Sequence, residues 1–169
     1  MPPISETVYL IYKTLFIGIG ATFILDLWAL LLNRLFHVSI TNWAMVGRWL
    51  GHLPSGQFIQ KKLVNARPIP FEKALGWLAH YIIGIVYVLI LISFEGTYWF
   101  TQPTILPPLL ISWILIIAPF FVMMPGMGAG IAGSNTLHPA KTRFFSFIGH
   151  SIFGLGMFIS AFLTNLHIG

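Results

Sequence analysis

Long apolar runs dominate the pattern of this chain. Four stretches of about 20 residues carry very few charged side chains and are separated by more polar segments: residues 13–32, 74–94, 105–124 and 144–166. A helix needs about 20 apolar residues to cross the hydrocarbon core of a bilayer. The pattern therefore predicts an all-α polytopic membrane protein, with four transmembrane helices in a bundle. Residues 1–169 then form a single membrane domain without room for a separate soluble one.

The connection between the first two runs, residues 33–73, is the longest. Within residues 42–52 and just after them, large apolar side chains recur near helical spacing, and they are Trp43, Val46, Trp49, Leu50 and Leu53. Arg48 lies elsewhere on the helical wheel. This arrangement is typical of a short amphipathic helix at the membrane surface, where Trp is enriched. We expect such a helix in the first loop.

Composition and charge agree with a membrane location. Apolar residues make up 57% of the chain and charged residues 8%, whereas soluble domains have about 25% charged residues. The basic residues gather in loops 33–73 and 125–143 or at their edges, so the positive-inside rule places both loops in the cytoplasm and both termini on the other side. These charges follow the membrane edges, so we expect contact with anionic lipid and no binding of nucleic acid.

Asp26 lies inside the first apolar run. A carboxylate near the centre of a membrane helix costs about 3 kcal/mol, so such residues usually face a protein interior and mark a site. His80 and His150 lie at a similar depth, roughly 10–12 Å from the basic residues that flank their helices, at 1.5 Å per residue. Met123 and Met127 approach the same layer. The sequence thus predicts a polar cluster of Asp26, His80 and His150 on the cytoplasmic side.

Binding of haem or of a transition metal is the most specific hypothesis for this cluster. Imidazole is the commonest protein ligand for such metals, and Met suits copper, so His80, His150, Met123 and Met127 are the candidate ligands. Paired histidines on two helices could also ligate haem iron from both faces. Gly84 and Gly154, each one turn from a histidine, would leave room for the flat ring.

Two further hypotheses use the same residues. Asp26 beside histidines could load and release a proton, which would suit proton-coupled transport of a small solute. Four spans are few for a transporter, so that function would need a homo-oligomer. Alternatively, Asp26 and a histidine could only orient the helices in a structural or assembly subunit without chemistry.

Enzymatic chemistry is not assigned by the sequence. The chain contains no cysteine, which excludes thiolate catalysis and disulfides, and it shows no Ser-His-Asp pattern, zinc-protease helix or dinucleotide fingerprint. We therefore name no catalytic residue. Arg48 is a candidate contact for a lipid head group or an anionic substrate at the interface.

Several sequence blocks together resemble a known family. They read LDLWALL at 25–31, VGRWLGH at 46–52, ALGWLAHY at 74–81, MGAG at 127–130 and His150-x3-Gly154-x-Gly156. In this combination the chain is similar to a bacterial membrane family catalogued as domain of unknown function 2938, from about Gly18 to Leu163. The resemblance implies a bacterial integral membrane protein, which we expect in the inner membrane. It supplies no activity, substrate or residue role.

Overall fold

The computed structural model describes residues 5–166, and these residues are helical with no strand. The predicted all-α class is confirmed. The main elements are α1 (Glu6–Phe36), α2 (Trp43–His52), α3 (Glu72–Glu95), α4 (Leu106–Ile114), a π-helical turn (Pro119–Met123), α5 (Met124–Gly126) and α6 (Pro139–Leu166). Short 3-10 turns lie at Leu53–Ser55, Leu63–Asn65, Thr97–Phe100 and Ile131–Gly133.

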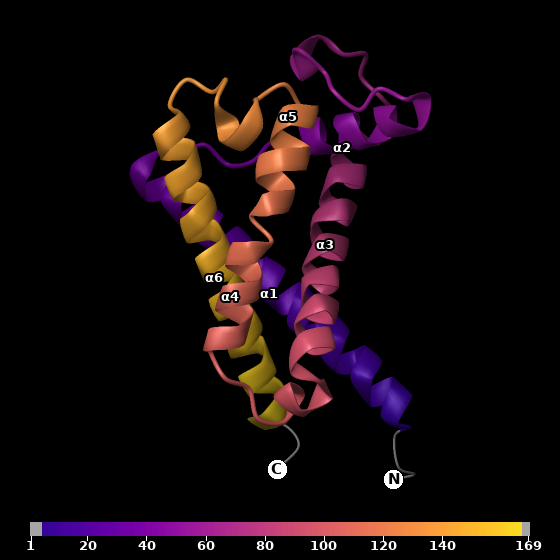
Figure 1. Ribbon diagram of the computed structural model, residues 1–169, viewed down its shortest axis with the longest axis vertical. Coiled ribbons are helices and arrows are strands. Elements are labelled where there is room, and N and C mark those ends of the chain that lie inside the picture. Colours follow the sequence, from indigo (N-terminus) through magenta and orange to yellow (C-terminus); the bar gives the residue numbers. More distant parts are fainter. Residues whose placement is uncertain (1–4, 167–169) are drawn as a thin grey trace.

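Four helical segments are long and apolar enough to cross a membrane, in the order that the sequence predicts: Glu6–Phe36, Glu72–Glu95, Leu106–Gly126 and Pro139–Leu166. The first is longer than the predicted run because its ends are set by polar caps. The Ser5 hydroxyl accepts a hydrogen bond from the Val8 N–H, and His37 ends the helix in the left-handed conformation. Figure 1 shows both described chain ends at one end of the molecule and the two long loops at the other.

The third span is not one continuous α-helix. It stops at Ile114 and resumes through the π-helical turn that begins at Pro119. Proline has no N–H, so the Leu115 carbonyl loses the donor that an α-helix would supply. That carbonyl instead accepts hydrogen bonds from the Ala118 N–H at 3.0 Å and from the Tyr87 hydroxyl of α3 at 3.2 Å. A neighbouring helix thus satisfies the polar group that the break exposes.

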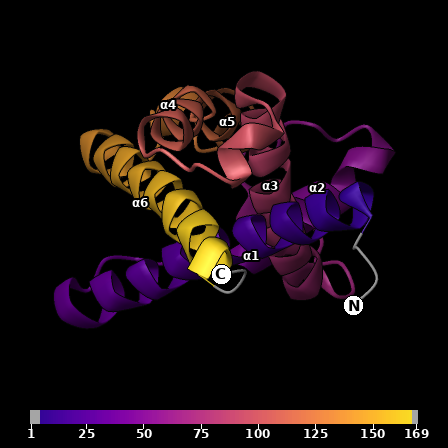
Figure 2. The same ribbon diagram turned by 90° about the horizontal axis from the view of Figure 1, so that it is seen from below.

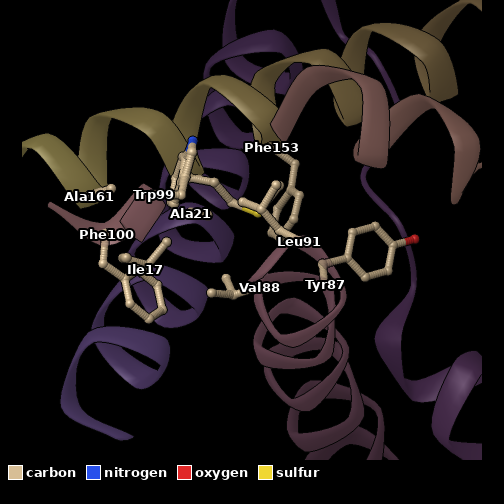
Figure 3. Packing of buried hydrophobic residues seen from close by; sticks show 10 residues of the cluster. Ile17, Ala21, Tyr87, Val88, Leu91, Trp99, Phe100, Phe153 and Ala161 are labelled. Carbon is tan, nitrogen blue, oxygen red and sulfur yellow. The ribbon is translucent and has the colours of Figure 1, made fainter. Parts of the chain in front are cut away.

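Helix α1 crosses the molecule obliquely and packs against both α3 and α6, while α4 packs against α6 and α3 (Figures 1 and 2). The buried core lies where these helices meet the Thr97–Phe100 turn (Figure 3). Its members are Ile17, Ala21, Tyr87, Val88, Leu91, Trp99, Phe100, Phe153, Met157 and Ala161. Many large apolar side chains point outward instead, among them Phe23, Leu27 and Ile83. Such a surface is expected of helices that face lipid.

Helix α2 lies at the loop end of the molecule and crosses the start of α3 (Figure 1). The predicted helix at residues 42–52 is present, with Asn42 as its N-cap. Two glycines make the crossing close: a Cβ atom on Gly47 would overlap the Glu72 carbonyl oxygen, and one on Gly76 would overlap the Trp43 carbonyl oxygen. This helix is therefore docked on α3 and does not merely rest on the membrane surface.

Arg48 extends from α2 to the first turn of α3. Its Nε and Nη2 groups donate to the two carboxylate oxygens of Glu72, each at 2.8 Å. The hydrogen bonds that the guanidinium donates to Glu72 raise the pKa of Arg48. The sequence suggested a head group or anionic substrate as the partner of Arg48, whereas the structure pairs it with Glu72.

Candidate functional site

Asp26 of α1 and His80 of α3 form a hydrogen-bonded pair between the two helices. His80 Nε2 lies 2.9 Å from Asp26 Oδ1, and the Tyr81 hydroxyl donates to Asp26 Oδ2 at 3.0 Å. Only 9% of the His80 side chain and 16% of the Asp26 side chain are exposed. Both carboxylate oxygens therefore have a hydrogen-bond partner on α3, in a largely enclosed position.

Aromatic rings enclose His80 on its other sides. The Trp43 indole stacks on the imidazole, with ring centroids 3.9 Å apart and planes at 24°. The Trp77 and Tyr81 rings meet it edge-on, at 5.8 and 5.6 Å between centroids. The close crossing at Gly76, one turn before His80, brings the start of α2 near enough for Trp43 to cover the ring.

His150 does not join this pair. Its Nδ1 donates to the Ser146 carbonyl oxygen of its own helix at 2.9 Å, and its ring lies beside that of Tyr87, with centroids 6.3 Å apart. Tyr87 is seven residues beyond His80 on α3, about 10 Å along the axis. His150 therefore lies beside a later turn of α3 than the one that carries His80, and the Asp26–His80 pair forms without it. That the three residues share one layer of the membrane stays a prediction.

The residues present do not fit a haem between His80 and His150. The space that Gly84 was expected to provide is occupied by α1, because a Cβ there would lie 3.0 Å from the Gly18 carbonyl oxygen. A Cβ on Gly154 would likewise lie 3.0 Å from the Pro108 carbonyl oxygen of α4. These glycines therefore serve close packing of helices, which is their usual role in membranes.

A transition-metal site also lacks a converging ligand set. Among residues 5–166, no three His, Asp or Glu side chains come together as a group that could hold a metal ion. Met123 ends the π-helical turn and Met127 follows α5. Their role as ligands stays a prediction.

Lys13 is a buried charged residue that sequence reasoning used only to mark the start of a span. Its exposed fraction is 0%. Lys13 Nζ donates to Thr164 Oγ1 at 2.7 Å and to Asn165 Oδ1 at 2.6 Å, and it lies 5.3 Å from the centre of the Tyr9 ring. A lysine at the edge of an apolar run normally indicates the membrane interface, so no local signal distinguished this one.

Trp43 and Tyr81 are further site residues that the sequence did not single out. Tyr81 follows His80 directly and reaches the same carboxylate, so its position next to His80 was an available signal. Trp43 had been assigned to the apolar side of an interfacial helix. Its contact with His80 depends on how α2 docks, which the sequence pattern does not show.

The fold and this site define a helical protein with four membrane-capable helices and an enclosed aspartate–histidine pair near the loop ends of two of them. The chain belongs to the family described as "Protein of unknown function (DUF2938)", whose model matches residues 15–164. That range contains every residue of the pair and its aromatic enclosure. No curated protein and no solved structure matches the chain.

Proposed function

We propose that this protein is an integral membrane protein that binds and releases a proton at the Asp26–His80 pair and couples this step to movement of a small solute. One observation carries the proposal: the Asp26 carboxylate accepts from Tyr81 on one oxygen and meets His80 on the other. A carboxylate and an imidazole in contact can share one proton in two ways, as carboxylate with imidazolium or as carboxylic acid with imidazole. Such pairs inside membrane helices commonly form proton relays.

A purely structural role accounts poorly for this pair. Interhelical polar contacts in membranes contribute about 0.6 kcal/mol on average, whereas insertion of the aspartate costs about 3 kcal/mol. Well-packed apolar side chains often replace a buried ion pair with no loss of stability. The energy balance therefore favours a function for Asp26 beyond joining α1 to α3.

The basic residues of the two long loops suggest how the protein is oriented in the membrane. The two basic loops favour a cytoplasmic position, which would place the pair on the cytoplasmic side and both termini on the other side of a bacterial inner membrane. Four spans offer little surface to enclose a solute path, so we propose that a homo-oligomer in the lipid bilayer is the working unit.

Trp43 provides an optical test, because a protonated imidazole quenches the fluorescence of an indole stacked on it. We expect the tryptophan fluorescence of the protein in lipid nanodiscs to fall as the pH is lowered through roughly 8 to 4, where imidazoles and carboxylic acids titrate. His80→Gln and Trp43→Phe should each remove this transition. Trp113→Phe serves as the matched control and should retain it.

The alternative is a structural or assembly subunit. It predicts that Asp26→Asn, which keeps shape and hydrogen bonding, leaves protein yield and cell phenotype close to wild type, whereas Asp26→Leu does not. Proton handling predicts that both substitutions are equally damaging to function. Two results would refute the proton-binding function. One is a wild-type fluorescence signal that does not change with pH, and the other is a pH-dependent change that His80→Gln does not remove.

A further inference from the structure

A small hollow lies directly outside the aromatic enclosure of His80. Its volume is about 190 Å³, and it is formed by the beginnings of α2 and α3, with the lining residues Thr41, Asn42, Trp43, Ala44, Lys73 and Trp77. Trp43 belongs both to this lining and to the stack on His80. Whatever enters the hollow therefore contacts the ring that covers the proposed proton site.

The charge of the hollow is positive. Lys73 is the only charged residue in its lining. The neighbouring Glu72 carboxylate is held on both oxygens by Arg48, so its negative charge is compensated. The Asn42 side chain already accepts hydrogen bonds from the N–H groups of Ala44 and Met45 at the start of helix α2, so the Lys73 ammonium supplies the positive charge of the hollow. Two indole rings supply apolar surface beside these charges.

The size of the hollow limits its occupant. Pockets for drug-sized ligands have volumes of about 300 to 1,000 Å³, and this one is smaller. It suits a single flat ring or a short apolar chain that carries one anionic group.

We infer that the hollow binds a small organic anion, with its carboxylate or phosphate group at Lys73 and its apolar part against Trp43 and Trp77. This inference rests on the proposed function and names the class of its solute. A proton held at the Asp26–His80 pair adds positive charge on the inner side of Trp43. Binding of the anion and binding of the proton then favour each other, and this coupling is reciprocal.

Benzoate is a suitable probe, because it joins a carboxylate to one flat ring. We expect radiolabelled benzoate to bind saturably to the full-length protein in phosphatidylcholine nanodiscs. Lys73→Gln should weaken binding by about tenfold or more, as expected for the loss of one charge-assisted contact. Ala44→Phe should abolish binding by filling the hollow while leaving every charge in place. Lys62→Gln, an exposed lysine outside the lining, is the matched control and should bind like wild type.

A lipid phosphate group has the same chemistry and could fill the same site. Nanodiscs that contain phosphatidylglycerol distinguish the two sources: if lipid is the natural occupant, benzoate binding falls there, and native mass spectrometry finds a bound phosphatidylglycerol that Lys73→Gln loses. If the occupant is a free anion, benzoate binds equally in both lipid compositions. Either result supports an anion site in the hollow.

Two results would overturn this inference. One is that the wild-type protein neither binds benzoate nor retains phosphatidylglycerol. The other is that Lys73→Gln and Lys62→Gln weaken benzoate binding equally. The fluorescence transition of Trp43 is measured without benzoate, so the proton-binding function can survive when the anion site fails. Conversely, benzoate binding that depends on Lys73 but not on pH would support the hollow as a binding site and remove its coupling to the proton.

Discussion

Two charged residues of α1, the buried Lys13 and the half-buried Asp26, pack against different neighbours. Asp26 meets His80 on α3, and Lys13 meets Thr164 and Asn165 on α6. A separation of 13 residues places them about 20 Å apart along the helix and about 220° apart around it. Because α1 lies between α3 and α6, each charge can reach a partner while most of the outer helix surface stays apolar.

The buried lysine gives a prediction about stability. Lys13→Met keeps most of the side-chain volume, and both former partners retain other hydrogen bonds, from Thr164 to the Ala161 carbonyl and from Asn165 to the Phe100 carbonyl. Asn165→Leu instead leaves the buried Lys13 amine with a single side-chain acceptor. Asn165→Leu also removes the hydrogen bonds from its amide to the Phe100 and Thr101 carbonyls. We therefore expect Asn165→Leu to destabilise the fold by about 1–3 kcal/mol, the cost of buried polar groups that lose a partner, and Lys13→Met by less.

Thermal unfolding in one detergent, followed by circular dichroism, measures both variants against wild type. The opposite ranking, with Lys13→Met the more damaging substitution, would show that the amine stabilises α1 through its charge and not only through these two acceptors.

At the scale of elements, the crossing of α2 and α3 controls the site. Gly47 and Gly76 allow the backbones to approach, the Arg48–Glu72 pair fixes the register of the two helices, and Trp43 is thereby placed on His80. A disturbance of the crossing should therefore reach the site without a change to any residue in it.

Gly76→Ala tests this dependence. The added methyl group would overlap the Trp43 carbonyl oxygen, so α2 must move away, with a loss of about 1–3 kcal/mol for overpacking. We expect a lower unfolding temperature and a loss of the pH-dependent quenching of Trp43. Gly149→Ala is the control, because a Cβ there meets its nearest neighbour, Leu25 Cδ1, at 3.7 Å. If Gly76→Ala and Gly149→Ala have the same unfolding temperature and the same pH-dependent quenching, the crossing of α2 and α3 does not control the site.

At the scale of the whole molecule, the orientation in the membrane is open to a direct test. The protein lacks cysteine, so a single cysteine can report on each side. Thr97 lies in the turn after α3, at the end of the molecule where the described part of the chain begins and ends, and Ser55 lies in the turn after α2, at the loop end (Figure 1). Both residues are exposed.

We expect a membrane-impermeant thiol reagent to label Thr97→Cys in intact cells and to spare Ser55→Cys, because the basic loops favour the cytoplasm. Labelling of both positions after the cells are broken is the control for reactivity. If intact cells label position 55 and spare position 97, the proposed orientation is reversed.

The sequence alone determined the number and order of the membrane-capable helices, the short helix near residues 42–52 and the expectation that Asp26 faces inward. These features depend on local properties: the length of an apolar run, the helical spacing of large side chains and the cost of a carboxylate among apolar residues. Even the break in the third span has a local cause, Pro119, although its consequence for Leu115 is not local.

Only the tertiary structure decided which groups meet. It joined Asp26 to His80 and placed His150 beside Tyr87, it paired Arg48 with Glu72, and it buried Lys13. These outcomes depend on how obliquely α1 lies and on how closely α2 approaches α3, and both follow from side-chain contacts between segments far apart in the chain. A hydrophobic pattern gives the face and depth of a residue along its own helix, but the neighbour that fills the space in front of it is a property of the packed molecule.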